Sequence, residues 1–389
     1  MGLFSWLSGK KASAEETRSE PPLPHHETPL ALDGLDDLIQ GLDSRDGAVR
    51  VDAAQLLVER WRGGDGRAAD AIAPRLEELL SDDEPQVRGA ALSAVRMMRK
   101  PENLERLSSA VLGLFADPAP AVRLGAIWAA VRLPGDVARG QVLAALDSED
   151  ESTRFAAACA LADVRDSAAL EELIAAMHED HRRQEALSAL MSLGDAAALP
   201  ALSALFDQES LGEFDRTLAA AALARFGDAR GKAHLAERVA ADGDDRPIAT
   251  EWAGRLFVQE ALPALEELSQ TEGDPGRGAA LRALGRLNAP GAEARLAAVA
   301  ENEDEADDLR MDAVEGLAEV GALARLEALA ARDDELGALC RELLVEARAE
   351  HSDDARAEQS DGARAEQSDD ARAEHSDAAE SVPPDRAKD

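Results

Sequence analysis

Aromatic side chains are scarce in this chain of 389 residues, and basic side chains are outnumbered by acidic ones. Aromatic residues make up 3% of the sequence and tyrosine is absent, which disfavours base-stacking platforms and aromatic ligand cages. Lys and Arg number 42 against 78 Asp and Glu, which gives a formal net charge of −36. Nucleic-acid binders neutralise phosphates with a basic face, and anionic membrane surfaces attract basic patches. The composition therefore argues against both partner classes.

Cysteines and long apolar runs are also few. The two cysteines, Cys159 and Cys340, lie in Ala/Leu-rich segments, so small buried thiols are expected rather than a disulfide framework or a metal cluster. The sequence has no run of about 20 apolar residues, so no transmembrane helix is expected. The first eleven residues have too short an apolar core for a secretory signal. We therefore expect a cytoplasmic protein.

The N-terminal segment, residues 1–11, combines a few apolar side chains with two lysines. Contact with a membrane is expected only through Leu3, Phe4, Trp6 and Leu7; docking on a partner and a frayed terminus are the alternatives. Myristoylation at Gly2 is not expected, because position 6 is tryptophan rather than serine or threonine.

Composition divides the rest of the chain into three segments. Residues 12–32 are polar and rich in proline, which predicts a disordered linker. Residues 33–347 carry apolar residues at three- and four-residue spacing, interrupted by Asp, Gly and Pro, which predicts helices and no strands. Residues 348–389 contain tandem octapeptides such as ARAEQSDG without large apolar side chains, which predicts a disordered acidic tail.

Internal repetition is the strongest signal in the sequence. An arginine near the start of a helix returns about every 32 residues. These arginines are Arg50, Arg88, Arg123, Arg154, Arg183, Arg216, Arg246, Arg277 and Arg310. An alanine follows each arginine by three positions, and Leu, Val or Ala follows by seven. Because these two offsets lie on one helix face, each unit is expected to pack that face against its neighbours.

These features resemble the HEAT repeat family in its short prokaryotic, phycobilisome-lyase-like form. The segments Asp82–Ala91 and Asp117–Arg123 carry the resemblance, which extends over residues 33–347. It implies an all-α solenoid of about nine to ten helix pairs. It also implies that Arg50, Arg88, Arg123 and Arg154 form a structural ladder with acidic residues of the loops. These arginines are therefore interpreted as structural rather than catalytic.

Signatures of catalysis are weak. No Gly-rich phosphate loop or nucleophile elbow is present. The cluster His178-Glu179-Asp180-His181 is one residue short of the zinc-protease spacing, so a solvated turn is the preferred interpretation over a metal site. HEAT-like deoxyhypusine hydroxylases use repeated His-Glu pairs, and His178-Glu179 is the only such pair inside the array. We expect no enzymatic activity, cofactor or metal.

A basic ridge is the candidate binding surface. The resemblance to HEAT repeats implies that the second helix of each unit lines the concave face. Residues at offsets five and nine from the repeat arginine point away from the Ala/Leu face. Arg225, Arg255 and Arg286 occupy offset nine in successive units, and Arg282 occupies offset five. The ridge is predicted to receive an acidic partner segment or the chain's own tail. Favourable interaction with the helix dipole is the structural alternative.

Trp128, at offset five, is the second candidate. It is interpreted either as an exposed aromatic anchor for a partner or as a residue packed against the neighbouring unit. Together these observations predict a monomeric, non-enzymatic scaffold or adaptor that binds another protein through its concave surface. The alternative is an accessory subunit of a modifying enzyme, such as a phycobilisome-lyase-like chromophore lyase.

Overall fold

A computed structural model describes residues 34–98 and 101–347 of the chain. The predicted contacts with Leu3, Phe4, Trp6 and Leu7, the linker 12–32 and the tail 348–389 lie outside these residues. Within the described part all regular structure is helical and no strand is present. The contacts divide the chain into two units, residues 1–228 and 229–389. The repeats had predicted a single array over residues 33–347.

The first unit contains thirteen described α-helices, several of which begin or end with a 3₁₀ turn. They are α2 (Leu35–Gly41), α3 (Gly47–Arg62), α4 (Gly66–Ile72), α5 (Leu76–Leu79), α6 (Pro85–Met97), α7 (Pro101–Gly113), α8 (Pro120–Ala130), α9 (Asp136–Ala145), α10 (Glu151–Asp163), α11 (Leu170–Ala176), α12 (Arg183–Leu193), α13 (Leu199–Phe206) and α14 (Glu213–Arg225).

The second unit continues the same alternation. Its helices are α15 (Ala229–Ala240), α16 (Arg246–Arg255), α17 (Leu262–Leu268), α18 (Arg277–Arg286), α19 (Ala292–Glu301), α20 (Asp307–Glu319) and α21 (Leu323–Leu329), followed by a helical segment over 335–347.

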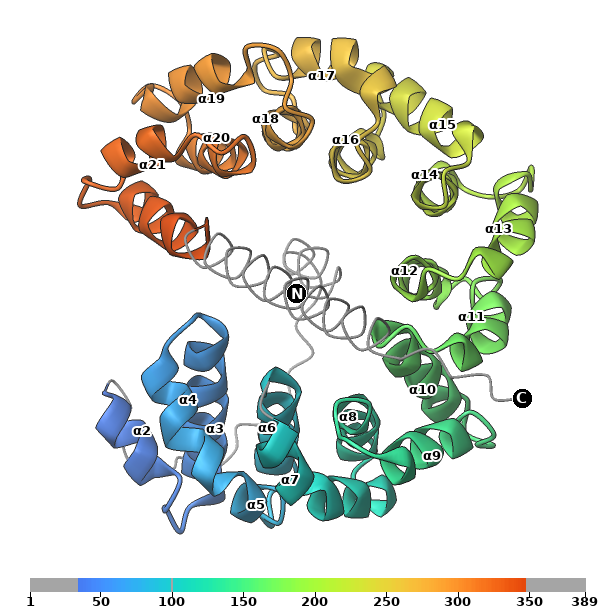
Figure 1. The fold of residues 1–389 in the computed structure, drawn as a ribbon, viewed down its shortest axis with the longest axis vertical. Helices are drawn as coiled ribbons and strands as arrows, with labels where there is room; N and C mark the ends of the chain where they lie inside the picture. Colours follow the sequence, from blue (N-terminus) through green and yellow to red (C-terminus); the bar gives the residue numbers. More distant parts are fainter. Residues whose placement is uncertain (1–33, 99–100, 348–389) are drawn as a thin grey trace, which may run out of the picture. The chain divides into compact units, whose positions relative to one another are not determined.

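Every repeat arginine lies in the first turns of a helix, as predicted. These helices form one layer in each unit: α3, α6, α8, α10, α12 and α14 in the first, and α16, α18 and α20 in the second (Figure 1). Successive members of the layer pack on one another, for example α6 on α8 and α18 on α20. The helices between them form a second layer, so each unit is an all-α solenoid and the predicted fold class is confirmed. We call the arginine-led layer the inner layer.

The alanine three positions after each repeat arginine explains this packing. All nine alanines three positions after the repeat arginines have no exposed surface: Ala53, Ala91, Ala126, Ala157, Ala186, Ala219, Ala249, Ala280 and Ala313. The residues at offset seven, from Leu57 to Leu317, are at most 1% exposed. Methyl-sized side chains let adjacent helices approach, and the larger side chains one turn later fill the remaining space.

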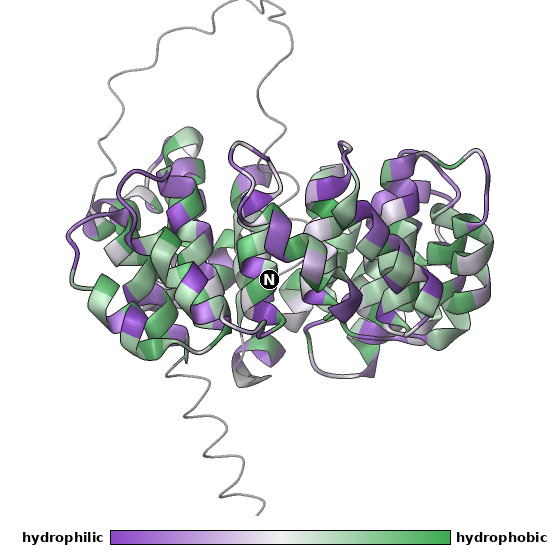
Figure 2. Cartoon of the chain, turned by 90° about the horizontal axis from the view of Figure 1, so that it is seen from above, coloured by the Kyte–Doolittle hydropathy of each residue, from purple (hydrophilic) through white to green (hydrophobic). Residues whose placement is uncertain are grey.

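Polar turns separate the helices (Figure 2). Aspartates cap several helix starts; the Asp46 side chain accepts a hydrogen bond from the Ala48 N–H, and the Asp65 side chain accepts one from the Arg67 N–H. Gly194 ends α12 in the left-handed region with φ of 70°, which glycine adopts without a Cβ penalty. No described helix is long and apolar enough to cross a membrane.

Candidate functional site

The repeat arginines first hold their own loops. Arg50, Arg88, Arg123, Arg154 and Arg183 each donate a hydrogen bond to the backbone carbonyl six positions earlier. Each also donates to the carbonyl five positions earlier. The guanidinium carries five N–H donors in a rigid fork, so it satisfies two loop carbonyls and retains donors for a neighbouring unit.

Arg50 and Arg88 use those remaining donors to pair with the next unit. Arg50 makes two hydrogen bonds with the Asp82 carboxylate, of 2.8 and 2.9 Å. Arg88 makes two bonds of 2.8 Å with Asp117. Both aspartates lie six positions before the arginine of their own unit. Their carboxylates also accept a local backbone N–H, that of Glu84 and that of Ala119.

Arg123 and Arg154 lack this aspartate. The residue six positions before the next repeat arginine is Ser148 for Arg123 and Met177 for Arg154. The hydrogen bonds of Arg123 within the described residues therefore go to its own loop carbonyls, and Arg154 adds a contact of 3.5 Å with Glu172. Arg123 and Arg154 thus keep the hydrogen bonds to their own loop carbonyls but lack the two-bonded pair with an aspartate of the next unit.

Later units form ladder pairs from other loop positions. Arg183 pairs with Asp215, Arg246 with Asp274 and Arg277 with Glu305, at 2.7 to 2.8 Å. In these three pairs the acidic residue lies one to five positions before the next repeat arginine.

The residues of the predicted basic ridge occupy two different units. Arg225 is exposed at the end of α14 in the first unit. Arg255, Arg282 and Arg286 come together on α16 and α18 in the second unit, around the carboxylate of Glu251. Glu251 contacts all three guanidiniums, at 2.7 Å for Arg255 and Arg286 and at 3.1 Å for Arg282.

Further carboxylates complete this charge network from α20. Arg282 also pairs with Asp312 and Glu315, and Arg286 pairs with Glu319. Arg282 is 8% exposed, although its offset predicted an outward position. Three guanidiniums thus face four carboxylates, and these three arginines do not form the free basic ridge that we expected.

Electrostatics in the network follow from burial. Burial alone would raise the pKa of Glu251, but the charges of Arg282 and Arg286 outweigh it and lower the pKa to about 2. Burial raises the pKa of Glu315 above its usual value. Glu251 is therefore the ionised centre of the network, whereas Glu315 lies at its margin with a single contact of 3.6 Å.

Trp128 combines the two predicted alternatives, an exposed anchor and a residue packed against the neighbouring unit. Its side chain is half-buried on α8, and the guanidinium of Arg96 on α6 lies 4.9 Å from its ring centroid. This distance is within the range of a cation–π contact. The aromatic ring therefore packs against the neighbouring unit and still contributes to the surface of the inner layer.

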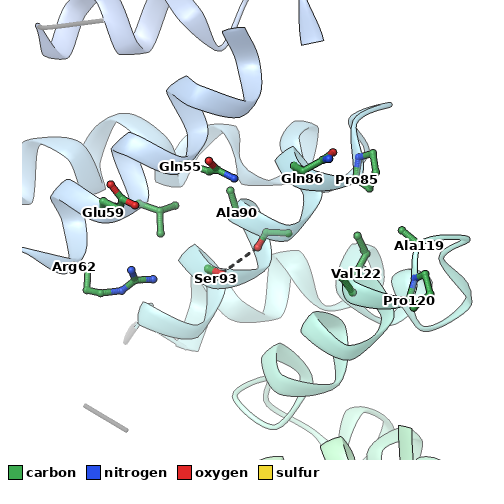
Figure 3. A pocket seen from close by; sticks show the side chains of 13 residues that line it. Gln55, Glu59, Arg62, Pro85, Gln86, Ala90, Ser93, Ala119, Pro120 and Val122 are labelled. Carbon is green, nitrogen blue, oxygen red and sulfur yellow. Dashed lines mark hydrogen bonds between the residues drawn. The ribbon is translucent and has the colours of Figure 1, made fainter. Parts of the chain in front are cut away.

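A groove across α3, α6 and α8 was not predicted from the sequence. It encloses about 640 Å³, and Figure 3 shows its lining. Gln55 and Arg62 come from α3, Gln86 and Ser93 from α6, and Pro120 from the start of α8. Its lining on α6 includes the small residues Gly89, Ala90 and Ser93 at offsets one, two and five, but other units also carry small residues at these offsets, such as Gly125, Ala156 and Ser188, so no sequence signal singles it out.

Glu151 lies in the cluster around His181, although sequence spacing did not suggest it. Ligand atoms of Glu151, Glu179 and His181 lie within 4.8 Å of one another. The guanidinium of Arg182 donates to both Glu151 and Glu179, at 2.5 and 3.1 Å. Ion pairing with arginine therefore explains why the two carboxylates are close together.

Both cysteines are buried, free thiols, in agreement with the expectation from their surroundings. Cys159 packs in α10, and Cys340 lies in the helical segment 335–347. Burial raises the pKa of each thiol above its usual value.

Comparison with protein families agrees with the geometry of the repeats. The family model for HEAT repeats matches residues 110–190, and the model for the PBS lyase HEAT-like repeat matches residues 182–208. These matches confirm the resemblance to HEAT repeats of the phycobilisome-lyase-like kind. No curated protein matches the chain.

Solved structures of helical-repeat proteins are similar to this chain at low identity. The complex of CpcE and CpcF of phycocyanin lyase from Nostoc is 17% identical, covers 79% of this chain and 99% of its own, and has a TM-score of 0.37. Human deoxyhypusine hydroxylase with glycerol is 20% identical, with coverage of 63% and 95% and a TM-score of 0.28. Importin beta is 14% identical, with coverage of 77% and 50% and a TM-score of 0.41.

Proposed function

We propose that the chain is a non-enzymatic HEAT-repeat scaffold that binds a segment of another protein on its inner layer. The observation that carries this proposal is the open groove of about 640 Å³ across α3, α6 and α8. An open groove that spans three successive helices suits an extended peptide better than a small metabolite, which usually binds in a cleft that buries most of its surface.

The lining supports binding rather than catalysis. The side-chain amides of Gln55 and Gln86 make no hydrogen bond among residues 34–98 and 101–347, so both can pair with the backbone of a bound segment. Pro85, Pro120 and Ala121 supply accessible apolar surface beside them. Such a mixture of apolar contact and a few polar groups is typical of a protein interface.

Capture of the partner from an extract of the source cells tests this function. Gln55→Trp and Gln86→Trp fill the groove from its surface and are expected to abolish capture of the partner. Ser109→Trp is the matched control, because Ser109 is exposed on α7 in the other layer. Capture that is equal for all three variants and the unaltered chain would contradict the proposal.

An accessory subunit of a chromophore-attaching enzyme is the second candidate. The match of residues 182–208 to the PBS lyase HEAT-like repeat is the observation that favours it. Absorbance of a bilin that co-purifies with the chain, or bilin transfer in the presence of a second subunit, would support this alternative over a general scaffold.

A further inference from the structure

Three arginines at the ends of successive inner helices have no carboxylate partner among the residues that the structure describes. Arg62 ends α3, Arg96 lies in the last turn of α6, and Arg132 follows α8 by two residues. None of them makes an ion pair with another residue of the part of the chain that the structure describes. We call these residues the arginine row.

The row contrasts with the arginines of the charge network around Glu251. Arg255, Arg282 and Arg286 also lie on successive inner helices, but the chain neutralises them with its own carboxylates. In the row, Arg62 and Arg132 lie close enough to Arg96 for their charges to affect its ionisation. On a chain of net charge −36, clustered guanidiniums without internal partners indicate a requirement other than solubility.

The positive charges of the row act on one another. Loss of hydration lowers the pKa of Arg96 below its usual value, and the positive charges of Arg62 and Arg132 lower it further. The carboxylate of Asp163 offsets part of this effect. Glu59 lines the same groove as Arg62, but no ion pair joins the two residues. A carboxylate from outside would relieve the repulsion between the guanidiniums.

Helix ends explain part of this placement but not all of it. The partial negative charge of a helix C-terminus favours arginine in the last turn. That attraction leaves the guanidinium donors without acceptors, and the fork of an arginine matches the two oxygens of a carboxylate. Arg62 also lines the groove, and Arg96 stacks on Trp128, so the row is continuous with the binding surface proposed above.

We propose that the arginine row and the adjoining groove bind an acidic segment of a partner protein. The inference rests on the proposed scaffold function and adds the chemistry of the partner. The carboxylates of the segment pair with Arg62, Arg96 and Arg132. Its backbone lies along Gln55 and Gln86, and its apolar side chains contact Trp128 and the groove floor.

Fluorescence anisotropy with three labelled peptides tests the proposal on the full-length chain. The probes are a peptide of alternating Glu and Leu and two otherwise identical peptides with Gln or Lys in place of Glu. We expect the Glu peptide to bind, the other two to bind at least tenfold more weakly, and added salt to weaken the Glu peptide.

Charge reversal locates the binding site. Each of Arg62→Glu, Arg96→Glu and Arg132→Glu is expected to weaken the Glu peptide roughly tenfold. Arg67→Glu is the matched control and should leave the affinity unchanged, because Arg67 is exposed on α4 in the other layer. Circular dichroism confirms that every variant remains folded. Equal binding of the Glu and Gln peptides, or equal losses in Arg67→Glu, overturns the proposal.

Two further outcomes would assign the surface to a different ligand. Binding that appears only after the acidic residues of 348–389 are replaced by amides would identify the chain's own tail as the occupant. Displacement of the Glu peptide by inorganic phosphate at equal concentration would identify a phosphate site. Either outcome overturns the assignment to a partner segment. Loss of partner capture in Gln55→Trp without preference for the Glu peptide would retain the scaffold and reject only its acidic partner.

Discussion

The guanidinium of Arg88 and the carboxylate of Asp117 form a two-bonded ion pair that joins one repeat to the next. Both bonds measure 2.8 Å, and the two side chains are 10% and 4% exposed. Burial alone would raise the pKa of Asp117, but the hydrogen bonds from Arg88 and from the Ala119 N–H hold it below its usual value. The pair therefore stays ionised inside the protein and fixes the loop before α8 against α6.

Asp117→Ala is expected to lower the free energy of unfolding by about 3–5 kcal/mol, because it leaves the Arg88 charge buried without a partner. Urea denaturation followed by circular dichroism measures the change. Asp70→Ala is the control: Asp70 is exposed on α4, and its removal should change stability by less than about 0.5 kcal/mol. Similar stability of the two variants would show that the pair contributes little.

Glu251 predicts a specific dependence of stability on pH. Its pKa falls from an ordinary value of 4.5 to about 2 because Arg282 and Arg286 outweigh the effect of burial. A group with a lowered pKa in the folded state stabilises the protein above its unfolded pKa and loses that contribution as the pH falls. The contribution of Glu251, on the order of 3 kcal/mol, is therefore complete above about pH 4.5 and is lost towards pH 2.

Denaturation of the unaltered chain and Glu251→Gln at a series of pH values measures this effect. The difference in stability between the two proteins should be largest near neutral pH and should shrink between pH 4.5 and 2. A difference that is the same at every pH would mean that the carboxylate charge of Glu251 does not stabilise the network.

The fold could be predicted from the sequence because it depends on local periodicity. The alanine three positions after each repeat arginine marks the helix face that carries small side chains. That alanine is buried in every unit, from Ala53 to Ala313. Helix geometry alone places offsets three and seven together, whatever the neighbouring unit contains.

Charge pairing between units could not be predicted in the same way. The offset of Arg282 places it away from the Ala/Leu face, but the neighbouring helices supply Glu251 and Glu315, which enclose it. These three residues all occupy offset five in successive units, so reading that row as alternating charges would have suggested an internal network. The groove was missed because its lining comes from three helices at once, so no single segment of the sequence carries it.

Close contact between inner helices gives a further prediction. A Cβ at Gly285 on α18 would lie 2.3 Å from the Gly316 carbonyl oxygen on α20, and a Cβ at Gly254 would lie 2.7 Å from the Ala283 Cβ. Gly285→Ala and Gly254→Ala are therefore expected to destabilise the protein by about 1–3 kcal/mol. Thermal or urea denaturation measures the effect.

Gly140 on α9, in the other layer, provides the opposite case. A Cβ there meets no atom within 4 Å, so Gly140→Ala should stabilise the protein by up to about 1 kcal/mol through helix propensity alone. If all three alanine variants were stabilised alike, the close approach of α18 to α16 and α20 would be wrong.

The two thiols test the burial of the inner layer and of the final helical segment. Cys159 and Cys340 are 4% and 0% exposed, and burial raises the pKa of both, so little thiolate is present at neutral pH. A disulfide reagent such as DTNB is therefore expected to react with neither thiol in the folded chain and with both in concentrated guanidinium chloride. Rapid reaction of one thiol under native conditions would show that its helix opens readily, and Cys159→Ser and Cys340→Ser would identify which helix it is.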